Sequence, residues 1–144
     1  MDNLYLIAKI AGTRIALRSQ AIESVVPVGD AILVPGAPPH IAGLFALRSR
    51  VLTLIDPHVV LGLAPSPITP GQRVIVIEIG GHGYALLADL IEDVCFIDAG
   101  EEPAKGRLAE GWARLSEAVV EHQGATLLVV DPARLVTPPL ARAA

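Results

Sequence analysis

Ile22-Glu23-Ser24-Val25 and Ile91-Glu92-Asp93-Val94 are two versions of one short pattern, and they lie 69 residues apart (91 − 22). The same offset aligns the residues that precede them: Ile10 with Ile79, Gly12 with Gly81, Ala16 with Ala85, and Leu17 with Leu86. Residues 52–57 resemble residues 127–132, at an offset of 75 (127 − 52), and both segments end in Asp-Pro. The chain is therefore built from two related units, with about six extra residues between positions 94 and 127 of the second.

Three β-hairpins are expected, because apolar residues flank turns that contain glycine. They cover residues 4–17, 74–87 and 118–130. Strands rich in Val and Ile, with regular Gly and Pro between them, predict an all-β chain with only minor short helices. A solenoid needs at least three repeats, and a small sheet exposes its edges unless it closes. The two units therefore predict two small five-stranded β-barrel lobes related by pseudo-symmetry.

The expected organisation is one domain over residues 1–144. Lobe 1 covers about residues 14–70 and lobe 2 about residues 71–136, with the proline-rich residues 64–71 as the connection. The N-terminal strand and the C-terminal segment are candidates for exchange between the lobes. A lobe of this size has only a marginal core, so we expect the lobes to pack together. The groove left between them would suit a partner helix.

Short helices are expected after each Asp-Pro. Asp56 and Asp131 have the composition of helix N-caps, each with Pro at the first helical position, which predicts helices at residues 57–61 and 132–135. Residues 108–115 are a third candidate helix. Asp56 also ends an apolar strand, as a phosphoacceptor would, but the duplication of Asp-Pro favours a structural cap.

Composition argues against several classes of function. The formal net charge is −4 and the only lysines, Lys9 and Lys105, are far apart, so no basic stripe offers itself to nucleic acid. The longest uncharged run, residues 31–47, is broken by three prolines and is too short to span a bilayer. The N-terminus lacks the basic region of a secretory signal. We expect a soluble, cytoplasmic protein.

Candidate chemical groups are few. Cys95 is the only cysteine, which excludes an intrachain disulfide, and it follows Val94 in an apolar strand as a buried hydrophobic residue would. The histidines are isolated from one another and from Cys95, which argues against a metal site; they are His40, His58, His82 and His122. Residues 80–83 are glycine-rich but lack the ending of a P-loop. We therefore expect neither enzyme activity nor a cofactor.

Two polar segments remain. Arg48-Ser49-Arg50 interrupts the apolar stretch 41–55 and is either a solvated turn or a positive anchor for a partner protein. The acidic segment 98–105 is read as a solvated connection.

In order and spacing, the residues resemble the CheW-like family of chemotaxis coupling proteins. Residues 35–56 are similar to the family's central pattern, in which a proline-containing turn and an apolar-x-Gly precede an Asn-Leu-Arg-Gly motif and a strand ending in Asp. Ile22-Glu23-Ser24-Val25 resembles the family's Val-x-Glu-Ile segment. The resemblance covers about residues 4–136 and favours the anchor interpretation of Arg48.

The resemblance implies a non-enzymatic adaptor with two five-stranded barrels around a shared core. It implies binding to the cytoplasmic tip of methyl-accepting chemoreceptors and to the regulatory domain of a CheA-type histidine kinase, with recruitment to membrane-bound receptor arrays. By position, the partner-binding residues would be Ile22, Ser24, Val25, Arg48, Val74 and Ile75.

This sequence departs from the family pattern at three places. Ser24 stands where the family often has Glu, Ser49 replaces the glycine after the arginine, and Pro57-His58 replaces Leu-Arg. Two other functions stay open. One is a CheW-like scaffold in a non-chemotactic signalling complex, and the other is a small β-barrel ligand binder or enzyme in which Cys95 and a histidine share a polar pocket.

Overall fold

The computed structural model describes residues 3–104 and 110–137. Within them the strands are β1 (Leu4–Ile10), β2 (Thr13–Arg18), β3 (Ser24–Pro27), β4 (Ile41–Leu47), β5 (Arg50–Ile55), β6 (Arg73–Ile79), β7 (His82–Leu86), β8 (Leu90–Phe96), β9 (Ser116–His122) and β10 (Ala125–Val130). The helices are short: η1 (Ser19–Ala21), α1 (Pro57–Val60), α2 (Glu110–Leu115) and α3 (Pro132–Val136). The predicted all-β class is confirmed.

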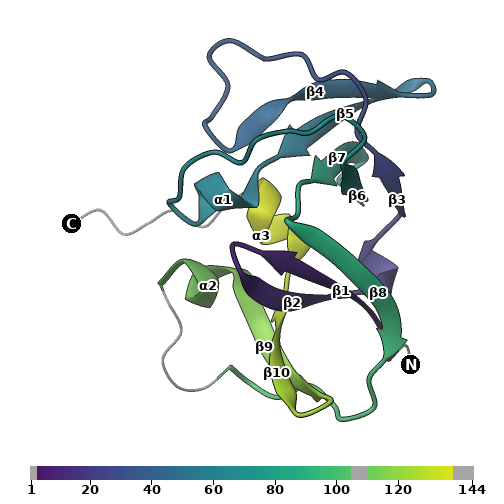
Figure 1. The fold of residues 1–144 in the computed structure, drawn as a ribbon, viewed down its shortest axis with the longest axis vertical. Helices are drawn as coiled ribbons and strands as arrows, with labels where there is room; N and C mark the ends of the chain where they lie inside the picture. The colour runs from purple at the N-terminus through teal and green to yellow at the C-terminus, as the bar shows by residue number, and fades with distance from the viewer. Residues whose placement is uncertain (1–2, 105–109, 138–144) are drawn as a thin grey trace.

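The strands form two five-stranded sheets, one in each lobe (Figure 1). The strand order is β8-β1-β2-β10-β9 in lobe A and β3-β6-β7-β5-β4 in lobe B. Strand for strand, the two orders correspond under the sequence repeat, because β8 matches β3, β1 matches β6, and β10 matches β5. Each lobe is therefore built from one hairpin of one unit and three strands of the other.

Strand registers reproduce the repeat residue by residue. Leu6 pairs with Val94 in lobe A, and its counterpart Ile75 pairs with Val25 in lobe B. The parallel pairing of β10 with β2 likewise matches that of β5 with β7. The two lobes are thus related by a pseudo-twofold axis that exchanges β3 with β8.

The sheets divide the chain differently from the expected split at residues 14–70 and 71–136. The hairpin β1–β2 pairs with β8 and β10, although these strands belong to the second unit. The hairpin β6–β7 pairs with β3 and β5 in the same way. The whole hairpin of each unit is exchanged, whereas the sequence suggested exchange of the N-terminal strand and C-terminal segment.

Neither sheet closes by pairing of its two edge strands, so the lobes are curled sheets rather than fully closed barrels. Instead, the segment that follows an edge strand crosses to the other edge. Isolated bridges join Ile32 to Leu44 of β4 and Glu102 to Val119 of β9. Gly43 is required at the first crossing, because a Cβ there would lie 2.8 Å from the Ile32 carbonyl oxygen.

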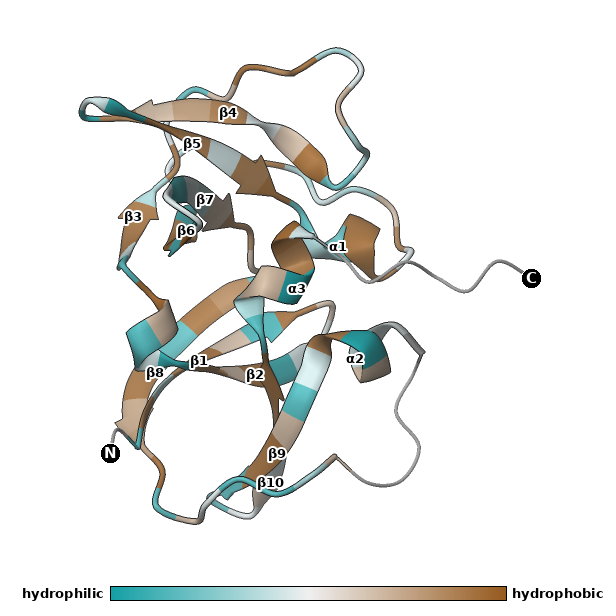
Figure 2. Ribbon diagram, turned by 180° about the vertical axis from the view of Figure 1, so that it is seen from behind, coloured by the Kyte–Doolittle hydropathy of each residue, from teal (hydrophilic) through white to brown (hydrophobic). Residues whose placement is uncertain are grey.

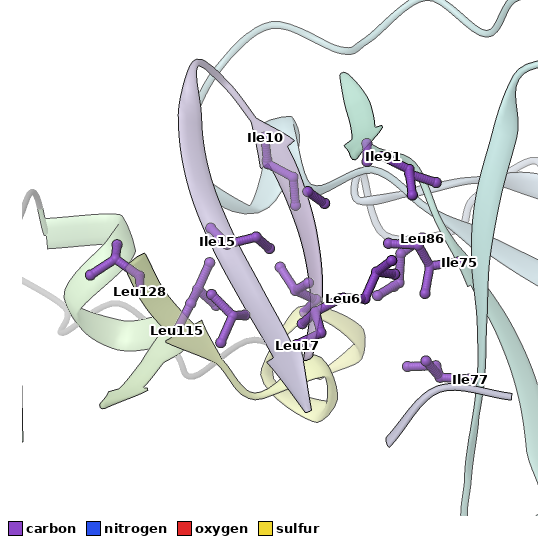
Figure 3. Close-up of a cluster of buried hydrophobic side chains, with 14 of the residues drawn as sticks. Leu6, Ile10, Ile15, Leu17, Ile75, Ile77, Leu86, Ile91, Leu115 and Leu128 are labelled. Carbon is purple, nitrogen blue, oxygen red and sulfur yellow. The ribbon is translucent and has the colours of Figure 1, made fainter. Parts of the chain in front are cut away.

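The apolar core has three parts. One cluster fills lobe A around Ile7 and Val129, and a second fills lobe B around Phe45 and Leu54. The third and largest lies between the sheets and includes Leu6, Ile10, Ile15, Leu17, Ile75, Ile77, Leu86, Ile91, Leu115 and Leu128 (Figure 3). Both faces of the central strands are therefore buried, as expected for lobes that stabilise each other.

The two Asp-Pro segments cap helices as predicted. The Asp56 carboxylate accepts a hydrogen bond from the His58 backbone N–H at 3.0 Å, and Asp131 accepts one from the Ala133 N–H at 3.1 Å. Asp56, which is 2 % exposed, also accepts from the Ser66 N–H at 2.7 Å and so holds the segment that connects the two units.

The third predicted helix, residues 108–115, is observed as α2 from Glu110, and positions 108–109 lie outside the described residues. Trp112 contributes to the core between the sheets. Gly111 lies against the end of α1, where a Cβ would come within 2.9 Å of Leu61 Cδ2. The extra residues of the second unit thus place α2 beside α1, on the side of the molecule opposite β3 and the end of β8 (Figure 1).

The acidic segment after β8 is more than a solvated connection over its described part, residues 98–104. Glu101 accepts hydrogen bonds from Arg18 Nη2 at 2.5 Å and from the Tyr5 hydroxyl at 2.6 Å, and Arg18 also pairs with Glu117 on β9. The hydrogen bond from Arg18 lowers the pKa of Glu101, and burial raises the pKa of Tyr5 to about 12. This network fastens the segment to β1, β2 and β9.

Candidate partner-binding surfaces

Three of the six predicted partner-binding residues lie together in one groove between the lobes. Ile22, Ser24 and Val25 approach the lobe A strands β1 and β8 there. The groove has a volume of about 290 Å³ and is lined by Leu4, Leu6, Ser19, Ile22, Ser24, Val25 and Val94. Its wall is almost wholly aliphatic, with two serine hydroxyls as the only polar side chains.

The apolar surface continues from the groove along β8. Val94 and Phe96 are 51 % and 74 % exposed. They lie opposite Leu6 and Leu4 in the β1–β8 pairing, so all four side chains share one face of the sheet. Figure 2 shows this hydrophobic stretch at the end of β8 nearest the N-terminus. A ridge of exposed aliphatic and aromatic side chains therefore borders the groove.

Val74 and Ile75 lie beneath this surface instead of on it. Both side chains are fully buried in β6. Ile75 pairs with Val25, and Val74 pairs with Val26. These two residues support β3 from inside, and their side chains offer no surface to a partner.

Arg48 is exposed at the turn between β4 and β5, outside the groove lining. Its φ angle is +58°, a left-handed conformation that favours glycine or asparagine. The other three tight hairpin turns of the described chain place glycine at the second central position, whereas this turn is Arg48-Ser49. A strained cation is thus held at the tip of a hairpin.

The ion pair between Arg50 and Glu23 was not predicted from the sequence. This pair joins the β4–β5 hairpin to the segment that enters β3, because Glu23 lies between the groove residues Ile22 and Ser24. The hairpin that carries Arg48 and the rim of the groove are therefore mechanically connected. The groove residues Leu4, Leu6 and Val94 were also missed, although Val94 is the repeat counterpart of Val25.

A second apolar surface lies on lobe B. Ile32 and Leu33, in the segment that crosses to β4, are 69 % and 78 % exposed, and Val51 on β5 is 64 % exposed. Beneath Leu33 is a hollow of about 320 Å³ whose other walls include Val28, Ala42 and Ile68. Val51 lies three residues after Arg48 and pairs with Ala46 on β4, so an exposed cation flanks exposed apolar side chains.

Cys95, His40 and His58 have different surroundings in the structure. Cys95 packs against the lobe A core, while His40 contacts the Val136 carbonyl oxygen at 2.9 Å through Nε2. His58 Nε2 lies 2.7 Å from Asp89 Oδ1. Neither the groove nor the hollow beneath Leu33 is lined by Cys95 or by a histidine.

Comparison with known proteins agrees with this geometry. The family model described as CheW-like domain matches residues 4–138, which is nearly the whole chain. The chain belongs to the CheW-like family. The structure of the scaffolding protein TtCheW from Thermoanaerobacter tengcongensis superposes on this CheW-like chain with a TM-score of 0.78 and 20% sequence identity, over 91% of this chain and 90% of that one. No curated protein sequence matches. Among the described residues, no helix has the length and apolar character needed to cross a membrane.

Proposed function

We propose that this CheW-like protein is a chemotaxis adaptor that couples methyl-accepting chemoreceptors to a CheA-type histidine kinase. It would act in the cytoplasm, at the receptor arrays, without catalysing a reaction. Membership of the CheW-like family supports the general role, and the groove between the lobes supports the mode of binding. Coupling then means that binding of one partner changes the free energy of binding the other.

The receptor site of this proposal is the groove between β1, β3 and β8. An apolar channel suits an amphipathic helix, whose residues at i, i+3, i+4 and i+7 supply a continuous stripe of side chains. Val94 and Phe96 would flank such a helix, and Ser24 would offer it a hydroxyl group. The main support for this helix site is that no charged residue lines the groove. A bound helix would therefore cover the groove without the free-energy cost of desolvating charged groups.

The kinase site of this proposal is the end of lobe B that carries the β4–β5 turn. Exposed Ile32 and Val51 supply apolar contact area, and Arg48 supplies a positive charge at the edge. A partner domain with an apolar patch and a nearby carboxylate would complement this surface. The Arg50–Glu23 ion pair connects this surface to the groove, which gives the two sites a physical path for coupling.

The experiment is a pair of calorimetric titrations with matched variants. One titrant is the isolated hairpin tip of a chemoreceptor and the other is the regulatory domain of a CheA-type kinase, both from the same genome. Ile22→Asp should weaken receptor binding at least tenfold and leave kinase binding within twofold. Arg48→Glu should do the reverse.

The outcomes separate the alternatives. If wild-type protein is folded but binds neither titrant, the chemotaxis assignment is wrong and a CheW-like scaffold of another signalling complex becomes the better explanation. If both variants weaken both partners equally, the assignment of separate sites is wrong. Far-UV circular dichroism and thermal unfolding of each variant exclude loss of fold as the cause.

A further inference from the structure

The pseudo-twofold axis creates a second position for the proposed partner helix. Leu4, Ser19 and Ile22 line the groove, and the offset of 69 residues carries them onto Arg73, Ala88 and Ile91. Those three residues line a hollow of their own, of about 190 Å³, together with Gln72, Asp89 and Leu90. The groove therefore has a counterpart at the beginning of β8, beside the first residue of β6.

The backbone around the two hollows is equivalent. Leu4 pairs with Phe96 in lobe A, and Arg73 pairs with Pro27 in lobe B, as the repeat requires. Both Leu4 and Arg73 are the first residues of their strands, β1 and β6. A helix accepted by one hollow would thus meet the same strand geometry at the other, so the difference between the hollows is one of side chains.

The lining of the counterpart hollow includes two charged side chains, Arg73 and Asp89, whereas the groove has none. Arg73 replaces Leu4, and its Nη2 donates a hydrogen bond to the Ile91 carbonyl oxygen at 3.1 Å, so the guanidinium group lies across the hollow. Asp93, the repeat counterpart of the groove residue Ser24, is exposed outside this lining and accepts a hydrogen bond from the Val94 backbone N–H at 2.8 Å. Asp89 lines the hollow as well. An apolar helix seated here would have to desolvate these ions.

We propose that the charged replacements, Arg73 above all, restrict the protein to one partner helix by closing the second of two pseudo-equivalent sites. This inference rests on the proposed function, because it takes the groove as the helix site. Leu4 and Arg73 then determine specificity as a pair, since Leu4 opens one position and Arg73 closes the other. A nearly symmetric fold would then bind the partner helix at one site only.

The test is the stoichiometry of binding to the isolated chemoreceptor hairpin tip, measured by calorimetry and by analytical ultracentrifugation. Wild-type protein should bind one hairpin. The variant Arg73→Leu with Asp93→Ser gives these two positions the side chains of their repeat counterparts, Leu4 and Ser24, and should bind two. If that variant does not fold, Arg73→Leu alone, at an exposed position, should show a second, weaker binding event.

Two further variants make the test reciprocal. Leu4→Arg should reduce binding at least tenfold, and the combination of Leu4→Arg with Arg73→Leu and Asp93→Ser should restore one hairpin per protein, at the other position. The matched control Arg14→Leu adds the same side chain outside both hollows and should leave the stoichiometry at one. Unaltered stoichiometry of one in the folded double variant would overturn the inference and leave the proposed function intact. Absence of binding by wild-type protein would overturn both.

Discussion

Gly83 on β7 lies directly under the side chain of Arg50, so that a Cβ atom at position 83 would come within 2.6 Å of Arg50 Nη2. The same Cβ would come within 2.5 Å of Leu52 Cδ2. The missing side chain at Gly83 is therefore what lets Arg50 cross β7 and pair with Glu23. Gly83 is not among the residues with positive φ, so its requirement is one of space rather than backbone conformation.

Gly83→Ala should destabilise the fold by about 1–3 kcal/mol, because the added methyl group overpacks the site between Arg50 and Leu52. Equilibrium unfolding in urea measures this cost. In an Arg50→Ala background one of the two close contacts is gone, so the same substitution should cost less. Equal costs in the two backgrounds would show that Arg50 and Gly83 are not coupled.

Arg48→Gly should separate the binding role of Arg48 from its effect on the fold. Glycine adopts φ = +58° without the strain that arginine bears, so the free energy of unfolding should rise by about 1 kcal/mol. Binding of the kinase regulatory domain should weaken at the same time, because the cation is lost. Urea unfolding and calorimetry on one sample measure both quantities.

Ser49→Gly is the matched control for this prediction. It changes the neighbouring position of the same turn and restores the glycine of the family pattern, while the cation stays. Kinase binding should remain within twofold of wild type. If Arg48→Gly leaves kinase affinity unchanged, the charge of Arg48 plays no part in that interface.

The internal repeat predicted most of the fold, because two units with the same spacing of strands and turns are expected to pair their strands in the same way. It did not predict that the β1–β2 and β6–β7 hairpins exchange between the lobes. The repeat offset is the same whether a hairpin pairs with strands of its own unit or with strands of the other unit. The choice between these two pairings depends on the packing of the core between the sheets. The capping roles of Asp56 and Asp131 were predictable because they depend on adjacent residues alone.

The candidate site was predicted in part. Ile22, Ser24 and Val25 lie in the groove, but Val74 and Ile75 are buried. A run of consecutive apolar residues such as β6 gives no alternation from which to tell an exposed face from a hidden one. Leu4 and Val94 line the groove because β1 pairs with β8, which is distant in the sequence. A local sequence pattern cannot predict such a pairing.

The network around Glu101 should make stability depend on pH in the acid range. The hydrogen bond from Arg18 lowers the pKa of Glu101 below its unfolded value of about 4.3. Its contribution is therefore fully present above about pH 4.3 and is lost as the pH falls through the lower, folded pKa. Glu101→Gln should cost about 1 kcal/mol at pH 7 and progressively less below pH 4.

Thermal unfolding of wild-type protein and the Glu101→Gln variant, recorded from pH 7 to pH 2.5, tests this dependence. The two melting temperatures should converge as the pH falls. Glu121→Gln is a suitable control, because Glu121 accepts hydrogen bonds from the neutral Thr126 hydroxyl and not from an arginine. A constant difference between wild type and the Glu101 variant down to pH 2.5 would contradict the assignment.

Asp56 and Asp131 occupy equivalent positions in the repeat, but their loss should have unequal cost. Asp131→Ala removes a helix cap and should cost about 1 kcal/mol. Asp56→Ala removes a cap and also leaves the Ser66 N–H without the buried carboxylate that accepts its hydrogen bond, so it should cost about 2–4 kcal/mol. Urea unfolding of both variants measures the difference. Equal costs would mean that the Asp56 contact with Ser66 does not hold the connection between the two units.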